Sequence, residues 1–433
     1  MATVSALVAA TLVGLPSAAP SAAVPVQEAA AMGAYVVVLH DSARGQLDAI
    51  VKEHRARYGE VTGFVYRHAL VGYSARIPNS QVSRLQNDPR VEMVAPDRPV
   101  HATQQRLSIG VDRVDGDVSS TRSGNGSGSV DAGVAILDSG IDLDHPDLNV
   151  AGGVNCVNRG KPPQDDQGHG TGVAGIVGAK DNDADTVGVA PGARLYAVKV
   201  LNTRLAGNDS RIVCGLDWVA QHAQGSNINV VNMSLAGISP DDGNCGRTKR
   251  DVLHLAVCKV NEAGVTVVVA AGNDSTDFAN TSPANYNEVL TVTAMQDADG
   301  QPGGLGTIAP GCQTTVPYDD AATDFSNFTT IGSADAAHTI AAPGLCLRTT
   351  ALIDGPGGGN VIWFGGTSFS SPHVAGTAAL CITTSCAGMT PAQVIAKLRA
   401  DAAAQPASYG FTGDPHTPID NRYYGYLDYA GKY

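Results

Sequence analysis

From residue 130 onward, short apolar runs alternate with segments that have helical spacing. The runs are unbroken rather than alternating in polarity, which is typical of strands that are covered on both faces. The expected strands cover 134–137, 195–201, 230–234, 265–270, 289–294 and 339–341. Strands that alternate with helices in this way form parallel sheets. The pattern therefore predicts an α/β fold, a doubly wound parallel sheet with helices on both faces.

Residues 34–100 predict a smaller α+β domain ahead of this sheet. The first expected strand is followed by a helix that carries Leu47, Ile50 and His54 at helical spacing and stops at Gly59. Strands are expected at 35–40, 62–68, 73–77 and 91–95, and a second helix at about 80–87. The order βαββαβ is that of a ferredoxin-like domain. Taken alone, this unit is compatible with any small binding module.

Residues 1–33 are expected to form a signal-peptide-like and linker segment. Residues 4–15 are apolar but too few to span a bilayer, and small-residue sites follow at 17–19 and 21–23. No Lys or Arg precedes the apolar part, which departs from the usual signal pattern. No other apolar run is long enough to cross a membrane. We therefore expect a secreted, soluble protein with no membrane partner.

All eight cysteines follow residue 150. An even number confined to one domain predicts disulfides and an oxidising compartment, although spacing does not settle the connectivity. The expected pairs are Cys381–Cys386, from proximity, and Cys245–Cys258 and Cys312–Cys346. A set of buried free thiols is the alternative.

The net charge of the chain is −13, and residues 1–106 carry 10 Lys and Arg against 8 Asp and Glu. Residues 107–433 therefore carry −15, which argues against a nucleic-acid partner. The glycine clusters at 303–306 and 355–359 lack the strand-before, helix-after context of a dinucleotide site, so turns are the better interpretation.

The segment 365–376 places Ser368 directly before a predicted helix. Two glycines permit a tight turn, and Pro372 suits the first turn of the helix. Backbone N–H groups at a helix start lack intrahelical partners, so a serine there can attack a carbonyl whose oxyanion meets donors already in position. The alternative is an ordinary helix N-cap.

Two further segments supply the groups that such a serine needs. Asp138 ends the first strand of the predicted sheet, at the edge where ligands bind in open α/β sheets. His169 lies between glycines ahead of another small-residue helix. Activation of a serine requires a base within hydrogen-bond reach and a carboxylate that orients the base. Asp138, His169 and Ser368 provide that set.

These segments resemble the motifs of the subtilisin-like serine proteases, the subtilases. The matches are Asp-Ser-Gly-Ile-Asp at 138–142, His-Gly-Thr-x-Val-Ala-Gly at 169–175 and Gly-Thr-Ser-x-x-x-Pro-His-Val-Ala-Gly at 366–376. The resemblance implies a subtilisin-like catalytic domain over 107–433 and a secreted serine endopeptidase that works through an acyl-enzyme, with no cofactor for catalysis. We expect a monomer.

Directly ahead of a subtilase domain, residues 34–100 resemble the inhibitory propeptide of the family. By that resemblance the domain assists folding and then occludes the cleft with its tail, residues 97–106, as an intramolecular inhibitor. We expect self-cleavage between about Pro99 and Ser108, so that the protein is made as a self-processing zymogen.

Asn273 ends a buried strand, where its side-chain N–H₂ can reach a developing oxyanion. A plain turn residue is the alternative. By match to the family, the substrate lies as an added strand. Small residues would leave room for a large apolar P1 side chain, and no acidic cluster supports a strict dibasic preference. One wall would be Ser234, Leu235 and Ala236, the other the backbone near Gly207, and the S1 floor Ala271 and Gly272.

Two residues depart from the family pattern. Phe369 follows the serine where many members have an oxidisable Met, so resistance to peroxide is expected there. Gly172 stands where a second His is common. Structural calcium is also expected by resemblance at Asp147 and in the oxygen-rich loop 180–187, with Asn182 as the best-matching ligand. A solvated acidic loop is the alternative there.

Two other classes of function are weighed against a protease. A silent binding or inhibitor-carrying protein on the same fold need not keep Asp138, His169, Asn273 and Ser368 together. An esterase of the α/β-hydrolase type would carry Gly-x-Ser-x-Gly, which is absent. The expected partners are therefore protein or peptide substrates and the chain's own propeptide.

Overall fold

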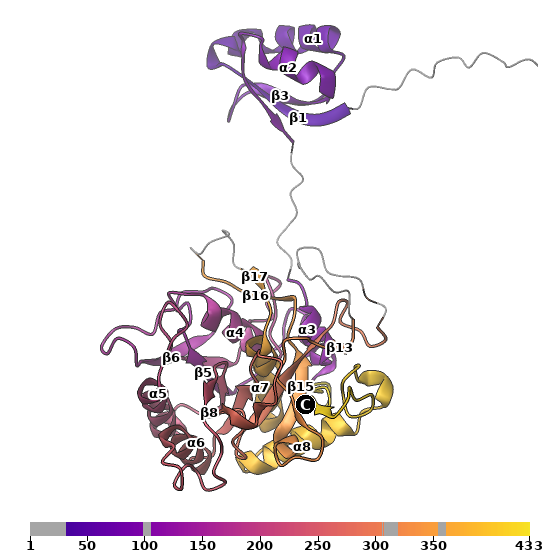
Figure 1. Cartoon of the computed structure of the whole chain (residues 1–433). Helices are drawn as coiled ribbons and strands as arrows, with labels where there is room; N and C mark the ends of the chain where they lie inside the picture. Colours follow the sequence, from indigo (N-terminus) through magenta and orange to yellow (C-terminus); the bar gives the residue numbers. More distant parts are fainter. Residues whose placement is uncertain (1–31, 98–104, 305, 307–318, 354–360) are drawn as a thin grey trace, which may run out of the picture. The chain divides into compact units, whose positions relative to one another are not determined.

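The computed structural model describes residues 32–97, 105–304, 306, 319–353 and 361–433. The described residues form two compact units, one within Met1–Ala102 and one within Thr103–Tyr433 (Figure 1).

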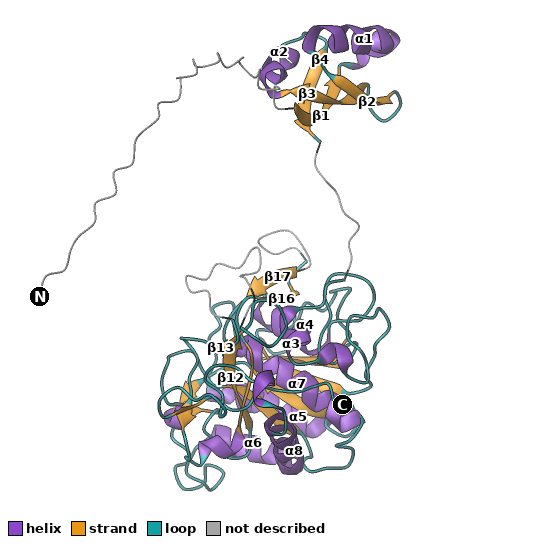
Figure 2. Cartoon of the chain, turned by 90° about the vertical axis from the view of Figure 1, so that its right-hand side faces the viewer, coloured by secondary structure: helices purple, strands orange, loops and turns teal. Residues whose placement is uncertain are grey.

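The smaller unit has the predicted βαββαβ order. Its four strands pair antiparallel in the order β2-β3-β1-β4, and both helices cover one face of the sheet (Figure 2). The first helix ends at Gly59, whose left-handed φ of 67° is the conformation that glycine adopts at helix ends. The elements are β1 (Met32–Leu39), α1 (Leu47–Tyr58), β2 (Val61–Tyr66), β3 (Gly72–Pro78), α2 (Val82–Gln86) and β4 (Val91–Pro96).

The larger unit contains the predicted parallel sheet. Its strands follow the order β6-β7-β5-β8-β10-β12-β15, and all neighbouring pairs are parallel. A two-residue strand, β13 (Ala321–Ala322), adds antiparallel to the end of β12. The main strands are β5 (Gly133–Asp138), β6 (Val150–Asn155), β7 (Arg194–Lys199), β8 (Ile228–Met233), β10 (Thr266–Ala270), β12 (Leu290–Gln296) and β15 (Thr339–Pro343).

Strand β6 is the main strand that the sequence pattern does not predict. It carries two adjacent glycines, Gly152 and Gly153, in place of an apolar run. A Cβ on Gly153 would lie 1.9 Å from the Ala197 carbonyl oxygen of β7, so close approach of the two strands requires glycine there.

Helices cover both faces of the sheet, as predicted. Along β5, Val134 and Ile136 enter one core, while Ala135 and Leu137 enter the other. Because both faces are buried, the strand needs apolar residues at every position, which explains the unbroken run. Helices α4 (His169–Gly178), α7 (Thr367–Thr383) and α8 (Pro391–Ala403) supply the first core, and α5 (Asp209–His222) and α6 (Val252–Glu262) the second (Figure 1).

Short elements surround this sheet. They are α3 (Ile109–Arg113), β9 (Gly237–Ile238), β11 (Thr281–Ser282), β14 (Thr329–Thr330), β16 (Leu347–Thr350), β17 (Val361–Phe364) and β18 (Arg422–Tyr423). None of the helices within the described ranges combines the length and the apolar character needed to cross a bilayer.

The sheet has its topological switch at β5. This strand lies between β7 and β8, so the chain winds outward from it in both directions. Ligands of open α/β sheets bind outside the carboxyl ends of the strands at such a point. Asp138, Ser234 and Asn273 end or follow β5, β8 and β10, so all three lie at this edge.

Three disulfides lie within the described part of the larger unit, where no free cysteine is found. Cys245–Cys258 and Cys381–Cys386 confirm two predicted pairs and contradict the free-thiol alternative there. Cys156–Cys214 was not predicted, because its partners are 58 residues apart. The expected pair Cys312–Cys346 involves Cys312, which lies outside the described residues, so that pairing stays a prediction.

Candidate active site

The end of β5 and the start of α4 bring Asp138 and His169 into contact. Nδ1 of His169 lies 2.8 Å from Oδ1 and 3.0 Å from Oδ2 of Asp138. Asp138 is fully buried, and its Oδ1 also accepts the Ser139 backbone N–H at 2.6 Å. Because a carboxylate only accepts hydrogen bonds, Nδ1 must carry the proton, and the lone pair of a neutral imidazole lies on Nε2.

Two effects oppose each other on His169. Burial lowers the pKa of the imidazole, but the negative charge of Asp138 and the hydrogen bond to it outweigh burial. The pKa of His169 therefore lies above its ordinary value of 6.5.

A buried carboxylate that sequence reasoning missed, Asp165, fixes the start of α4. Its Oδ1 accepts the Ser139 hydroxyl at 2.9 Å and the Gly168 N–H at 3.0 Å. Its Oδ2 accepts the Thr171 N–H at 3.0 Å and the Thr171 hydroxyl at 2.6 Å. Asp165 thereby ties the loop after β5 to the turn that holds His169. An aspartate just ahead of a small-residue helix was the available signal.

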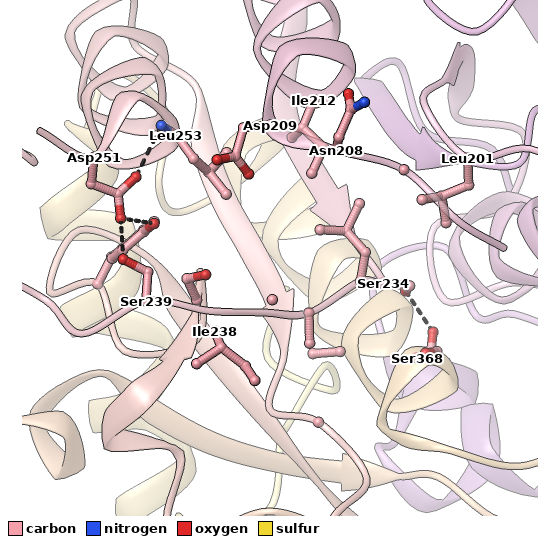
Figure 3. Close-up of a pocket in the computed structure, with 18 of the residues that line it drawn as sticks. Leu201, Asn208, Asp209, Ile212, Ser234, Ile238, Ser239, Asp251, Leu253 and Ser368 are labelled. Atoms are coloured by element: carbon pink, nitrogen blue, oxygen red, sulfur yellow. Dashed lines mark hydrogen bonds between the residues drawn. The ribbon is translucent and has the colours of Figure 1, made fainter.

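Ser368 is the second residue of α7 and lines the same pocket as His169. Gly366, just before the helix, has φ 134°, a conformation that a side chain rarely permits. The Ser234 hydroxyl donates to the Ser368 carbonyl at 2.6 Å (Figure 3). It also lies 3.0 Å from the Ser371 hydroxyl. Ser234 thus joins the end of β8 to the helix that carries Ser368.

The orientation of the Asn273 amide follows from its partners. The Thr367 backbone N–H and the Thr367 hydroxyl both lie 2.9 Å from Oδ1 of Asn273. A backbone N–H can only donate, so the atom that faces it must be oxygen. The Gly272 N–H donates to the same Thr367 hydroxyl at 3.1 Å, which leaves that hydroxyl proton for Asn273. Oδ1 is thereby occupied, and the N–H₂ group of the pocket-lining Asn273 remains available to a ligand.

The pocket has a volume of about 630 Å³ and lies at the carboxyl edge of the sheet (Figure 3). Most predicted substrate-contacting residues line it: Gly207, Ser234, Leu235, Ala236 and Gly272. Ala271 does not, because its side chain is fully buried in the core on the α5 and α6 side. The expectation that Ala271 floors the pocket is therefore wrong, and neighbouring Ala270 and Gly272 line it instead.

Charged residues also line the pocket, which the sequence pattern does not predict. Asp209 and Asp251 are among them (Figure 3). Asp274, Lys249 and Arg250 line the pocket as well. No two of the three carboxylates share one of the tight acidic clusters found among the described residues.

The carboxylate of Asp251 already accepts hydrogen bonds from several groups of the protein. It accepts the N–H groups of Leu253 and His254 at 3.0 Å each, as the N-cap of α6. The hydroxyls of Ser239 and Tyr286 bind it at 2.7 and 2.8 Å. These bonds leave Asp251 little capacity to bind a basic substrate side chain.

The expected calcium ligands lie together. Nδ2 of Asn182 donates to Oδ1 of Asp147 at 3.0 Å. Oδ2 of Asp147 is buried without a hydrogen-bond partner, and burial raises the pKa of this carboxyl to about 6. Asp147 therefore fits a cation. Asn182 turns its nitrogen toward Asp147 and its oxygen to the Ala184 N–H, so its amide would have to reverse to serve as a ligand.

Comparisons with known proteins agree with this arrangement. The sequence model described as "Subtilase family" matches residues 130–426, and that described as "Peptidase inhibitor I9" matches residues 34–103. The chain belongs to the subtilase family. It is a subtilisin-like serine peptidase with an I9 propeptide domain ahead of the peptidase domain.

Individual relatives show the extent of the similarity. Subtilisin NAT of Bacillus subtilis subsp. natto is 32% identical over 314 residues, which cover 72% of this chain and 70% of that protein. The extracellular serine proteinase of Thermus sp. (strain Rt41A) is 33% identical over 326 residues, 73% of this chain and 67% of that protein. The crystal structure of a cold adapted subtilisin-like serine proteinase matches with a TM-score of 0.53 and 25% identity, covering 74% of this chain and 97% of that one.

Proposed function

We propose that the protein is a secreted, self-processing serine endopeptidase whose triad is Asp138, His169 and Ser368. The observation that carries the proposal is the pairing of His169 Nδ1 with Asp138 in the pocket that Ser368 also lines. This pairing leaves Nε2 as the free base of the imidazole.

In the proposed mechanism, Ser368 Oγ attacks the scissile carbonyl while His169 Nε2 accepts its proton. Asp138 holds the tautomer and stabilises the imidazolium that forms. The free N–H₂ of Asn273 and the Ser368 backbone N–H receive the oxyanion. His169 then gives its proton to the leaving amine. Water attacks the acyl-enzyme with His169 as base again, and His169 returns that proton to Ser368 Oγ as the acid product leaves. All these groups belong to the polypeptide, so the reaction needs no cofactor.

We propose a broad specificity with preference for an apolar P1 side chain. Leu235, Ala236 and Gly272 offer little polar surface to that side chain, and the backbone near Gly207 lies across the same pocket. An extended substrate segment would pair with these backbone edges as an added strand.

Residues 34–100 are proposed to act as the intramolecular inhibitor. The sheet of this domain bears helices on one face only, and Phe64 and Met93 on its strands are 76% and 47% exposed. Such apolar exposure is typical of a surface that docks on a partner. Cleavage is proposed between about Pro99 and Ser108, which would release the peptidase from the propeptide.

We further propose one structural calcium ion held by Asp147. The buried, unpartnered Oδ2 of this residue supports the proposal, because a divalent cation would supply the missing partner. Asn182 would join after reversal of its amide. Secretion is supported by the disulfides and by the extracellular Thermus relative. We expect the mature enzyme to be a monomer.

The first test is the intact mass of the purified chain over time, for wild type and Ser368→Ala side by side. Wild type should lose its first ~100 residues while Ser368→Ala stays full length. A fluorophosphonate should label wild type at Ser368 alone. If folded wild type neither shortens nor becomes labelled, the protease proposal is wrong, and a silent binding protein on this fold becomes the better hypothesis.

A further inference from the structure

Phe369, the residue after Ser368, touches the imidazole of His169. The two rings meet edge to face, with centroids 5.0 Å apart and planes at 64°. Phe369 is 2% exposed and is not among the residues that line the pocket. It therefore contacts the base from outside the pocket that Ser368 lines.

A second aromatic ring supports the first. Phe364, the last residue of β17, stacks on Phe369 with centroids 4.5 Å apart and planes at 8°. The three rings form a row from the β16–β17 hairpin to His169. Asp138 holds one edge of the imidazole, and Phe369 packs against the ring, so contacts from two directions limit its tilt.

Gly172, three residues after His169 in α4, explains why this row fits. A Cβ on residue 172 would lie 2.7 Å from Cε2 of Phe364 and 3.2 Å from Cε1 of Phe369. Gly172 lies in a regular helix and has no left-handed φ, so its backbone does not require glycine. Alanine is the better helix former at such a position. The space taken by the two rings is therefore what requires glycine.

We infer that Phe364, Phe369 and Gly172 form one positioning unit that holds the His169 imidazole in its productive orientation. The two departures from the family pattern, at positions 172 and 369, are then one coupled feature, in which the aromatic pair fills the space that a side chain on residue 172 would take. The inference rests on the proposed role of His169 as the base.

The test measures kcat and KM per active site, with sites counted by fluorophosphonate titration. Gly172→Ala should lower kcat by about 10- to 100-fold, because small displacements of a base are costly. Phe369→Leu should lower it by about 3- to 10-fold, the range expected for loss of one aromatic contact. KM should stay within about twofold in both variants, since neither residue lines the pocket.

The decisive variant is the double substitution Gly172→Ala with Phe364→Leu. Loss of the ring should make room for the new methyl group and recover part of the lost kcat, by about threefold or more over Gly172→Ala alone. Gly225→Ala is the matched control, because nothing lies within 4 Å of its Cβ position and its φ is not left-handed. That control should keep wild-type kcat.

Several outcomes would overturn the inference. A Gly172→Ala enzyme with wild-type kcat would do so, as would a folded, titratable double variant no faster than the single one. If Gly172→Ala fails to mature, the Phe369→Leu variant tests the inference instead. A wild-type kcat in that variant, or a change in KM alone, would contradict a positioning role. Failure of the proposed function is distinguishable, since wild type itself would then escape fluorophosphonate labelling.

Discussion

At the scale of single residues, Asp138 decides the proton affinity of the proposed base. Its charge and hydrogen bond raise the pKa of His169 against the effect of burial. A base must be neutral to accept a proton, so activity should be present above the pKa of His169 and lost as pH falls through it. The acidic limb of the kcat/KM profile should therefore lie above pH 6.5 in wild type.

In Asp138→Asn the charge of Asp138 and its hydrogen bond are lost, and only the charge of Asp165 still opposes burial. The pKa of His169 should therefore fall, and the acidic limb should move to lower pH. The loss of tautomer control should lower kcat by about 10⁴-fold. The pH profile of kcat/KM measures both effects. Asp144→Asn removes the same charge from an exposed position in the nearby loop and should leave the profile unchanged. An unmoved limb in Asp138→Asn would contradict the assignment of His169 as the base.

Replacement of Asn273 tests the proposed oxyanion site. Its amide is oriented by Thr367 so that the N–H₂ group remains available in the pocket. Asn273→Ala should lower kcat by about 100- to 1,000-fold with little change in KM, because the donor acts on charge that develops only in the transition state. Asn280→Ala, at an exposed position outside the pocket, is the control. A change in KM alone would make Asn273 a substrate-binding residue.

At the scale of elements, the disulfides join segments at different distances along the chain. Cys156–Cys214 ties the end of β6 to α5 across 58 residues, whereas Cys245–Cys258 spans 13 and Cys381–Cys386 spans 5. A cross-link stabilises the fold mainly by restricting the unfolded chain, and the effect grows with the enclosed loop.

Replacing each pair by alanines should therefore lower the free energy of unfolding by about 4, 3 and 2 kcal/mol in that order. The order, more than the values, is the prediction. Urea unfolding in the Ser368→Ala background avoids self-digestion and gives the three values under one set of conditions. Equal losses, or the largest loss at Cys381–Cys386, would show that local contacts and not chain entropy dominate.

Strands were predicted correctly where a local run of apolar residues marks them. The strand that ends at Asp138 is apolar throughout because cores form on both its faces. Strand β6 was not predicted because it has glycine where an apolar residue would mark a strand. Glycine is required at position 153 because the Ala197 carbonyl leaves no space for a Cβ. Nothing near Gly153 in the sequence signals that neighbour.

At the scale of the whole molecule, the proposed calcium ion should govern stability against pH. Without a cation, burial raises the pKa of Asp147 to about 6, so the folded state binds a proton that the unfolded state releases at lower pH. Stability contributed by this group is then present below the ordinary carboxyl pKa and is lost as pH rises through about 6.

Saturating calcium should offset that loss and raise the stability at pH 8, by about 2.7 kcal/mol at a concentration 100-fold above Kd. Chelation should lower Tm of the Ser368→Ala protein at pH 8, and Asp147→Asn should make Tm indifferent to both calcium and chelator. Asp144→Asn should keep the calcium response. A wild-type Tm that chelation leaves unchanged would favour a solvated loop without an ion.

Local sequence patterns are enough to predict two domains, the α/β class of the larger one and the motifs that contain Asp138, His169 and Ser368. These features follow from local periodicity and from short runs of residues, which can be recognised without knowing which other segments pack against them. Four features emerge only from the folded structure: the partner of Cys156, the role of Asp165, the exclusion of Ala271 from the pocket and the fit of Phe364 over Gly172. Each of these depends on contact between segments far apart along the chain, and such contacts are defined only when the packed fold brings those segments together.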